Sequence, residues 1–302
     1  MAGRQTLLFT SIKHKLYQDA IDLHLVQPYT IAEMSDVLRM PSEDFNDLPP
    51  FPKDFYNVSK DDILKQGTRW PTPDVLNAQR VLMKNFTKYA HEIVLLAWEL
   101  LNNHLGLPVG TLLKMHRLEG ISGDQIHLIK APPQPPDDRR TALAEHTDFD
   151  SITVLFNRLG GLQILPPGDQ AEWCYMKPLL GHAIVNLSDA LVKFTNGLLR
   201  SNIHRVSSPP GTQAGTTRYS LVYFSRPEDD LILKRLQGST KIPPLAKDEV
   251  EEEINSKDWI IRRGLGRRPG IHGTKAFDWT SFRGSEEKSR RINAQVNLAQ
   301  LS

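Results

Sequence analysis

Short β-type runs separated by turn residues occupy the chain between residues 125 and 224, and they restrict the possible folds more than any other feature. Each run contains five to seven residues, many of them β-branched or aromatic, and Gly, Pro or Asp residues lie between the runs. The runs cover residues 125–130, 151–156, 161–165, 182–187, 202–206 and 218–224. Strands this short and this closely spaced are typical of a sandwich or a barrel rather than a doubly wound sheet. The sequence therefore predicts a mainly β fold with flanking helices.

One long helix is predicted ahead of these runs, from about Pro73 to Leu105. Thr72 suits the N-cap and Pro73 the first helical position, and Gly106 ends the pattern. Apolar residues recur along the helix at steps of three and four: Leu82, Phe86, Tyr89, Ala90, Ile93, Ala97, Leu100 and Leu101. This spacing predicts an amphipathic helix with one face against the core.

Three segments are expected along the chain of 302 residues. Residues 1–70 form a poorly defined N-terminal segment, in which 31–38 is a candidate short helix. Residues 71–270 are expected to hold the long helix and the β structure. Residues 271–302 are polar and basic, and they are expected to form a C-terminal tail.

Composition and charge exclude several functional classes. The chain has 37 basic and 35 acidic residues, and this net charge of +2 gives no reason to expect a nucleic-acid partner. The most apolar window, 93–101, is far shorter than the roughly 20 residues of a membrane span, so no membrane partner is expected. The single cysteine, Cys174, excludes an internal disulfide framework and fits a reducing compartment, so a cytoplasmic location is expected.

His146-Thr147-Asp148 is the first candidate for chemistry, because nowhere else does a carboxylate follow a histidine at two residues. With 10 histidines and 35 acidic residues among 302, about one such pair is expected by chance, so its context matters. In a strand, residues two apart point to the same face, and an imidazole and a carboxylate can then share one metal ion.

His204, in the strand-like run 202–206, is the best candidate for a third ligand. Two histidines and one carboxylate form the facial triad of non-haem Fe(II) sites. Zinc more often takes three histidines, or two histidines with Glu. The donor types therefore favour iron.

Arg218 and Ser220 are the candidates for an anion site. They lie two residues apart in the run 218–224, so both side chains point to the same side of a strand. A guanidinium binds a carboxylate through two parallel hydrogen bonds, and a neighbouring hydroxyl adds one more donor. This pair therefore suits one end of a dicarboxylate co-substrate.

Taken together, these motifs resemble the iron(II)/2-oxoglutarate-dependent dioxygenases. The order along the chain is His-x-Asp, then His204, then Arg-x-Ser on a late strand. Four blocks look like the isopenicillin-N-synthase-like branch of that family, and fungal members of natural-product pathways are the most similar. The blocks are AEHTDFD (144–150), GGLQIL (160–165), AIVNLSDAL (183–191) and TNGLLRS (195–201). The resemblance covers roughly residues 73–237.

The resemblance implies a double-stranded β-helix, or jelly roll, flanked by helices and forming the catalytic domain in residues 71–270. It implies that His146, Asp148 and His204 bind Fe(II), with no catalytic residue beyond this metal site. It further implies that Arg218 and Ser220 hold the distal carboxylate of the co-substrate 2-oxoglutarate, while O2 takes the last open position. Ascorbate is a candidate supporting reductant.

The implied reaction is the oxidation of a C–H bond in a small organic molecule, by hydroxylation, desaturation or ring chemistry, in secondary metabolism. Succinate and CO2 are the implied co-products. Two alternatives stay open. In one, an iron oxidase works without 2-oxoglutarate, and Arg218 and Ser220 bind the substrate's own carboxylate. In the other, the chain is a degenerate, non-catalytic jelly-roll binding protein.

Two features depart from the family pattern. Ile129 and Ala131 stand where the family usually has Asn and Tyr before a Pro-Pro segment, which implies altered positioning of the co-substrate. Nothing in residues 1–70 resembles the usual N-terminal domain. This domain is therefore expected to be shortened or remodelled, with an exposed sheet edge.

Overall fold

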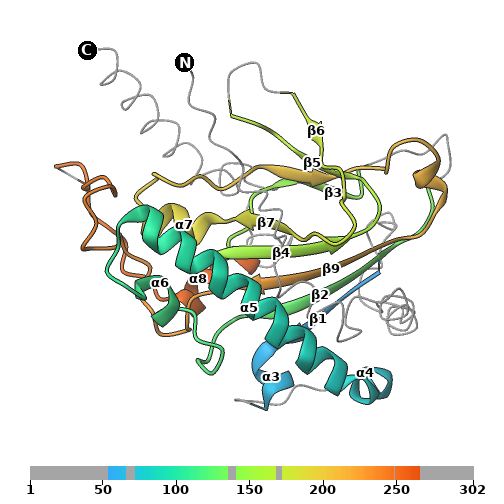
Figure 1. The fold of residues 1–302 in the computed structure, drawn as a ribbon, viewed down its shortest axis with the longest axis horizontal. Helices are drawn as coiled ribbons and strands as arrows, with labels where there is room; N and C mark the ends of the chain where they lie inside the picture. The colour runs from blue at the N-terminus through green and yellow to red at the C-terminus, as the bar shows by residue number, and fades with distance from the viewer. Residues whose placement is uncertain (1–53, 66–71, 135–140, 168–171, 248, 266–302) are drawn as a thin grey trace.

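The computed structural model describes residues 54–65, 72–134, 141–167, 172–247 and 249–265, and two antiparallel sheets form its centre (Figure 1). The five-stranded sheet has the order β1-β2-β9-β4-β7, and the four-stranded sheet has the order β3-β8-β5-β6. The strands are β1 (Asp54–Ser59), β2 (Gln125–Ala131), β3 (Leu143–His146), β4 (Ile152–Asn157), β5 (Leu162–Ile164), β6 (Cys174–Tyr175), β7 (Ile184–Leu187), β8 (His204–Val206) and β9 (Arg218–Ser225). This is the double-stranded β-helix, or jelly roll, that the resemblance implied.

The strand predictions between residues 125 and 224 are confirmed, with ends that differ by one or two residues. Strands β2, β4, β5, β7, β8 and β9 all overlap the predicted runs. The sequence misses β1, β3 and β6. Strands β3 and β6 have four and two residues, too few to show an alternation, and they form by pairing with β8 and β5. Strand β1 belongs to the N-terminal segment left undefined by the sequence, and it forms one edge of the large sheet.

The predicted long helix is divided into two helices, α4 (Asp74–Ala78) and α5 (Arg80–Leu105). They are separated by Gln79, whose φ of −101° and ψ of 12° leave the helical region. The predicted end is confirmed, because Gly106 adopts a left-handed φ of 65° and its N–H bonds back to the carbonyl groups of the last turn.

The predicted N-cap at Thr72 is wrong. The helix starts one residue later, so Pro73 takes the cap position, where no side chain accepts a hydrogen bond from the first turn. The carbonyl oxygen of Thr72 instead accepts a hydrogen bond from Nδ2 of Asn77 at 2.8 Å.

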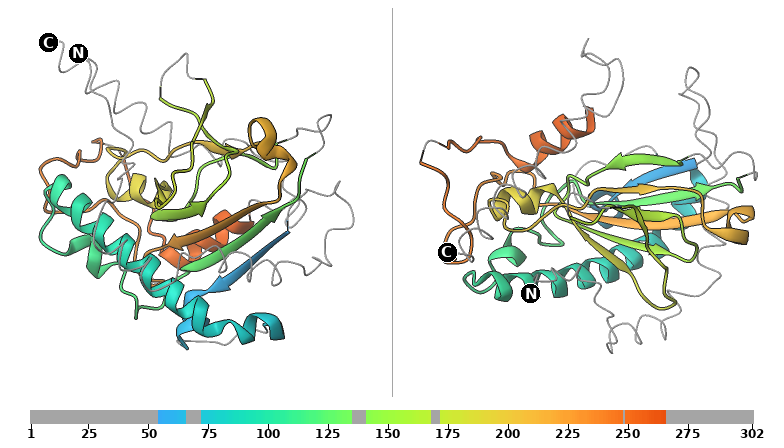
Figure 2. Two further views of the ribbon diagram at one scale, coloured as in Figure 1. Left: turned by 45° about the vertical axis from the view of Figure 1, so that its right-hand side comes forward. Right: turned by 90° about the horizontal axis from the view of Figure 1, so that it is seen from above.

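Helix α5 covers one face of the five-stranded sheet (Figure 2), and alternate residues of β9 serve the two faces of that sheet. Tyr219 and Tyr223 point to the helix side, where Tyr223 and Trp98 of α5 share one apolar core. Arg218 and Ser220 point to the opposite side, toward the second sheet. The large sheet therefore has an apolar face that holds the helix and a face with polar positions inside the jelly roll.

Helix α7 (Asp189–Phe194) follows β7, and α8 (Ser256–Leu265) lies on the side of the molecule away from α5 (Figure 2). Shorter helical segments are α3 (Lys60–Leu64), α6 (Thr111–Lys114) and the 3-10 turn η1 (Gly211–Gly215). No helix in the described part of the chain is long and apolar enough to cross a membrane. The candidate helix at 31–38 and the predicted tail at 271–302 lie outside the described residues.

Candidate functional site

The two predicted histidine ligands lie side by side on the four-stranded sheet. His146 is the last residue of β3 and His204 is the first residue of β8, and the antiparallel register places them opposite each other. Their ring centroids are 4.2 Å apart. Pairing of β3 with β8 thus brings together two imidazoles that are distant in the sequence.

Asp148 lies beyond the end of β3, so the prediction that one strand carries both His146 and Asp148 is wrong. The first residues of α7 hold this loop. The backbone N–H of Asp189 donates to the carbonyl of Asp148 at 2.9 Å, and that of Ala190 donates to the carbonyl of Asp150 at 3.0 Å. The N–H groups in the first turn of a helix have no acceptor within the helix. Here they bond to carbonyl groups that would pair with a neighbouring strand if β3 continued.

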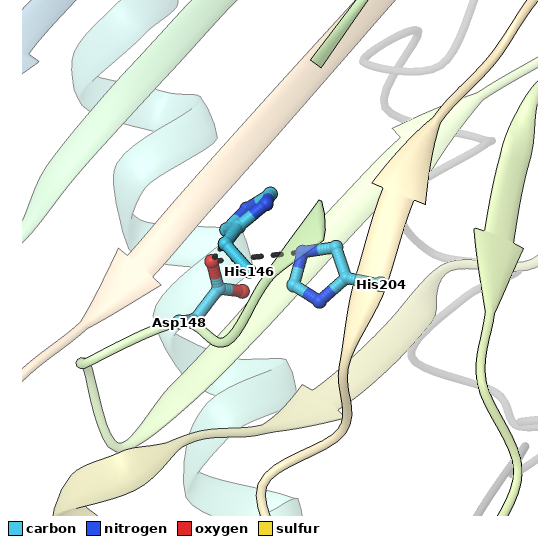
Figure 3. Close-up of side chains that lie close together, drawn as sticks. All are labelled: His146, Asp148 and His204. Carbon is cyan, nitrogen blue, oxygen red and sulfur yellow. Dashed lines mark ion pairs between the residues drawn. The ribbon is translucent and has the colours of Figure 1, made fainter. Parts of the chain in front are cut away.

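The side chains of His146, Asp148 and His204 point toward one another (Figure 3). Oδ1 of Asp148 lies 3.7 Å from Nε2 of His146 and 3.7 Å from Nε2 of His204. One candidate ligand atom from each residue lies within 4.8 Å of the others. Within the described residues, this is the only group of three or more His, Cys, Asp or Glu side chains with such spacing.

The hydrogen bond of the His204 ring suits metal ligation through its other nitrogen. Its Nδ1 lies 3.1 Å from the carbonyl oxygen of Asn202, and because a carbonyl only accepts hydrogen bonds, Nδ1 carries the proton. In the neutral imidazole with its proton on Nδ1, Nε2 carries the lone pair that can bind a metal, and Nε2 is the atom that faces Asp148. Two imidazoles and one carboxylate in a facial arrangement are typical ligands of Fe(II) and leave three positions open. The donor set therefore fits the metal that the resemblance implies.

Two polar side chains hold the second carboxylate oxygen of Asp148. Oδ2 accepts hydrogen bonds from Oγ1 of Thr153 at 2.9 Å and from Nδ2 of Asn186 at 3.0 Å. Oδ1 of Asn186 accepts in turn from Nδ2 of Asn202 at 3.3 Å. The sequence reasoning missed all three residues. The available signal was one Thr in the run 151–156 and one Asn in the run 182–187, where most of the other residues are apolar.

Arg218 and Ser220 lie together inside the jelly roll. Nη1 of Arg218 donates to Oγ of Ser220 at 2.6 Å, and Nε donates to the carbonyl of Gly160 at 2.8 Å. Arg218 is 4% exposed, and burial lowers the pKa of its guanidinium to about 10. Among the described residues, no carboxylate forms an ion pair with it. A buried cation without a counter-charge is costly, so this position favours an anionic ligand.

Gly160 links this guanidinium to the sheet that carries the histidines. Gly160 lies just before β5, which pairs with β8 so that Ile164 is opposite His204. Thr153 of β4, which bonds to Asp148, is opposite Phe224 of β9, and Phe224 lies an even number of residues from Ser220, so Thr153 and the anion site share one face of the large sheet. The anion site and the cluster of histidines and Asp148 therefore occupy one interior between the two sheets.

The departures at Ile129 and Ala131 lie directly beside the anion site. Strand β2 runs antiparallel to β9, with Ile129 opposite Ser220 and Ala131 opposite Arg218. Neither side chain carries a polar atom. Among these four positions, only Arg218 and Ser220 on β9 offer polar side chains to an anion.

Comparisons with known proteins agree with this geometry. The family model of the 2OG-Fe(II) oxygenase superfamily matches residues 123–227. A 2-oxoglutarate-dependent dioxygenase of Aspergillus fumigatus is 35% identical over 232 residues, which cover 70% of this chain and 57% of that protein. A 1-aminocyclopropane-1-carboxylate oxidase of Diospyros kaki is 30% identical over 246 residues, which cover 79% of this chain and 70% of that protein. The chain spans between 50% and 59% of the length of three fungal 2-oxoglutarate-dependent dioxygenases that it matches.

Solved structures share the fold. A full-length Neurospora crassa protein, solved in complex with alpha-KG and 5-formyluracil, aligns with a TM-score of 0.67 at 21% identity, over 84% of this chain and 83% of that chain. The dioxygenase for auxin oxidation in rice aligns with a TM-score of 0.57 at 19% identity, over 85% and 82% of the two chains. At these identities the likeness concerns the arrangement of sheets and helices.

Proposed function

The chain belongs to the 2OG-Fe(II) oxygenase superfamily, and on this basis we propose that it is an iron(II)- and 2-oxoglutarate-dependent oxygenase. It would oxidise a C–H bond of a small organic molecule, by hydroxylation, desaturation or ring chemistry, in secondary metabolism. Fungal relatives named as 2-oxoglutarate-dependent dioxygenases support this proposal.

The convergence of His146, Asp148 and His204 in the same interior as the buried Arg218 carries the proposal. The two histidines and Asp148 would hold Fe(II) from one side and leave three positions open. Bound iron would supply the O2 activation that couples the conversion of 2-oxoglutarate to succinate and CO2 with oxidation of the substrate.

The residues of the chain would bind, orient and shield the reactants. Arg218 and Ser220 would bind the distal carboxylate of 2-oxoglutarate, whose negative charge would offset the cost of burying the guanidinium. His204 would keep its proton at Nδ1, on the carbonyl of Asn202. Asp148 and Arg218 are 6% and 4% exposed, so these two groups, which would bind metal and co-substrate, lie away from bulk water.

One relative favours a second candidate function. The Diospyros kaki protein is named a 1-aminocyclopropane-1-carboxylate oxidase, and this name describes a substrate with its own carboxylate. In an oxidase of this kind, Arg218 and Ser220 would bind the substrate carboxylate, and the reaction would not require 2-oxoglutarate. Dependence on 2-oxoglutarate therefore separates the two candidates.

The same proposal includes a cytoplasmic location and no nucleic-acid partner. The net charge of +2 supports the second statement. The single cysteine supports the first, because Cys174 is an exposed free thiol, which suits a reducing compartment.

Reconstitution with Fe(II) in the absence of O2 tests the metal site and both candidates. Wild-type protein is expected to bind one Fe(II) per chain, and 2-oxoglutarate is expected to change the absorption spectrum of the metal-loaded protein. His146→Ala is expected to lose iron. His104→Ala is the matched control, because His104 is an exposed histidine on α5 outside the cluster.

Admission of O2 with 2-oxoglutarate and ascorbate is then expected to yield succinate. Unchanged iron content in His146→Ala would refute the metal site and with it the proposal. Iron binding without any spectral response to 2-oxoglutarate would instead favour the second candidate.

A further inference from the structure

We infer that Thr153 and Asn186 are positioning residues that make Asp148 offer a single oxygen, Oδ1, to the metal. The inference rests on the proposed function, because it concerns the same iron site. Oδ2 of Asp148 accepts hydrogen bonds from both residues, at 2.9 and 3.0 Å. Oδ1 is the oxygen that faces Nε2 of both histidines, at 3.7 Å each. The two carboxylate oxygens therefore have different tasks.

The arrangement follows from the strand register of the large sheet. Thr153 of β4 and Asn186 of β7 are directly opposite each other, so their side chains stand on the same face of the sheet. The carboxylate of Asp148 accepts a hydrogen bond from each of these two side chains, and we call Thr153 and Asn186 the clamp. Thr153 and Asp148 are each 6% exposed, so water competes little for these bonds. Hydrogen bonds to a charged acceptor are about twice as strong as those between neutral groups.

Asn202 extends the clamp to the second histidine. The amide of Asn186 can donate to Asp148 only through Nδ2, which leaves its Oδ1 to accept from Nδ2 of Asn202 at 3.3 Å. The carbonyl of Asn202 accepts from Nδ1 of His204 at 3.1 Å. A chain of hydrogen bonds thus joins Asp148 to His204 outside the space between the ligand atoms. It orients both ligands together.

The clamp has a chemical consequence. A carboxylate with both oxygens available can bind a metal through both and occupy two coordination positions. With Oδ2 engaged by two donors, Asp148 would occupy one position. Three positions would then stay open, which is the number that a 2-oxo acid bound through two atoms would need together with O2. Residues that only support a ligand thereby determine how many reactants the metal accepts.

Titration with Co(II) tests the inference without any turnover, because the visible spectrum of Co(II) reports its coordination. Thr153→Val removes the hydroxyl and keeps the shape, and Asn186→Leu removes the amide. Each is expected to weaken Co(II) binding by about 10- to 100-fold, as is typical when a residue supporting a metal ligand is lost. Each is also expected to change the Co(II) spectrum and to weaken 2-oxoglutarate binding to the metal-loaded protein.

Two further variants separate a positioning role from a general loss of stability. Thr153→Ser retains the hydroxyl and is expected to restore wild-type affinity and spectrum. Thr87→Val is the matched control, because Thr87 is also buried and its hydroxyl donates only to the carbonyl of Met83, within α5. It is expected to leave the affinity for Co(II) and the spectrum unchanged. Thermal unfolding without metal verifies that each variant is folded.

The outcomes distinguish failure of the inference from failure of the proposed function. If His146→Ala loses Co(II) while Thr153→Val and Asn186→Leu keep the wild-type affinity and spectrum, the clamp is refuted and the metal site stands. If His146→Ala binds Co(II) as tightly as wild type, the metal site itself is refuted, and the clamp with it. If Thr153→Val or Asn186→Leu does not fold, the alanine variant at the same position replaces it, with the same expected change in the Co(II) spectrum, and an unchanged spectrum refutes the inference.

Discussion

Replacing Arg218 with glutamine is expected to weaken binding of 2-oxoglutarate by about 100-fold while metal binding stays unchanged. The magnitude comes from the burial of the guanidinium, which lowers its pKa to about 10. Since a tenfold change in an acid constant corresponds to 1.36 kcal/mol, keeping this cation desolvated costs about 3 kcal/mol. A bound carboxylate would offset most of that cost, and about 3 kcal/mol corresponds to roughly a 100-fold change in the dissociation constant.

Thermal unfolding of the metal-loaded protein without O2, with and without 2-oxoglutarate, measures this difference. At a ligand concentration of 100 times the wild-type dissociation constant, bound ligand stabilises the wild type by about 2.7 kcal/mol. At the same concentration, a variant with 100-fold weaker binding gains only about 0.4 kcal/mol. Arg235→Gln is the matched control, because Arg235 also donates to backbone carbonyls, those of Ile242 and Pro243, in the segment after β9. It is expected to respond to 2-oxoglutarate as the wild type does.

The substitution is also expected to affect the ligand-free protein. Glutamine retains an N–H donor for the carbonyl of Gly160 and removes a buried charge that has no carboxylate partner among the described residues. Arg218→Gln is therefore expected to unfold in the absence of ligand at a temperature no lower than the wild type does. Equal stabilisation of variant and wild type by 2-oxoglutarate would refute the assignment of Arg218. A large loss of stability without ligand would refute the view that this cation is uncompensated.

Three further predictions concern stability. Burial lowers the pKa of His116 to about 4, whereas a histidine in the unfolded chain has a pKa near 6.5. Below pH 6.5 the unfolded chain therefore binds a proton that the folded protein does not, and the free energy of unfolding should fall by about 3 kcal/mol between pH 6.5 and pH 4. Urea unfolding across this pH range should show that the free energy of unfolding of His116→Gln depends less steeply on pH than that of the wild type. The same dependence on pH in both proteins would contradict the prediction. Gly161→Ala should destabilise the protein by about 1–3 kcal/mol, because the φ of Gly161 is +104° and an added Cβ would lie 2.7 Å from the carbonyl oxygen of Ser207. Denaturant unfolding measures this change, and a variant as stable as the wild type would contradict the prediction. Trp259→Phe removes the indole N–H that donates to the carbonyl of Phe149 at 3.0 Å. This substitution should lower the free energy of unfolding by about 1 kcal/mol in chemical denaturation, and an unchanged free energy of unfolding would show that the bond does not stabilise the fold.

Much of the fold follows from patterns that neighbouring residues carry. Alternation along the β-type runs predicted β9 and the shared face of Arg218 and Ser220, because residues two apart point the same way in any strand. The steps of three and four residues before Leu105 predicted a helix with one face in the core. Strand β3 escaped prediction because four residues paired with β8 form no pattern of their own.

For the candidate site, too, the sequence indicated the residues but not all of their local structure. His146, Asp148 and His204 were selected from the sequence by residue type and spacing, yet the reason offered for His146 and Asp148, a common strand, was wrong. The backbone N–H groups at the start of α7 bend the loop that carries Asp148, and no signal near residue 148 indicates that contact. The three candidate ligands were therefore selected with an incorrect local structure, and the fold brings them together by another route.

The roles of Thr153 and Asn186 illustrate what a linear chain does not reveal. A Thr and an Asn in two separate β-type runs do not by themselves identify a common partner, and they meet at one carboxylate because β4 and β7 pair with these two positions opposite each other. A shift of that register by one residue would turn Asn186 to the helix side of the sheet. Residue types and periodicities are local properties, so the amino-acid sequence sufficed for six of the strands, for most of the long helix and for the choice of candidate ligands. The convergence of Asp148, Thr153, Asn186 and Asn202 depends on hydrogen bonds between distant segments, which exist only after both sheets have packed together.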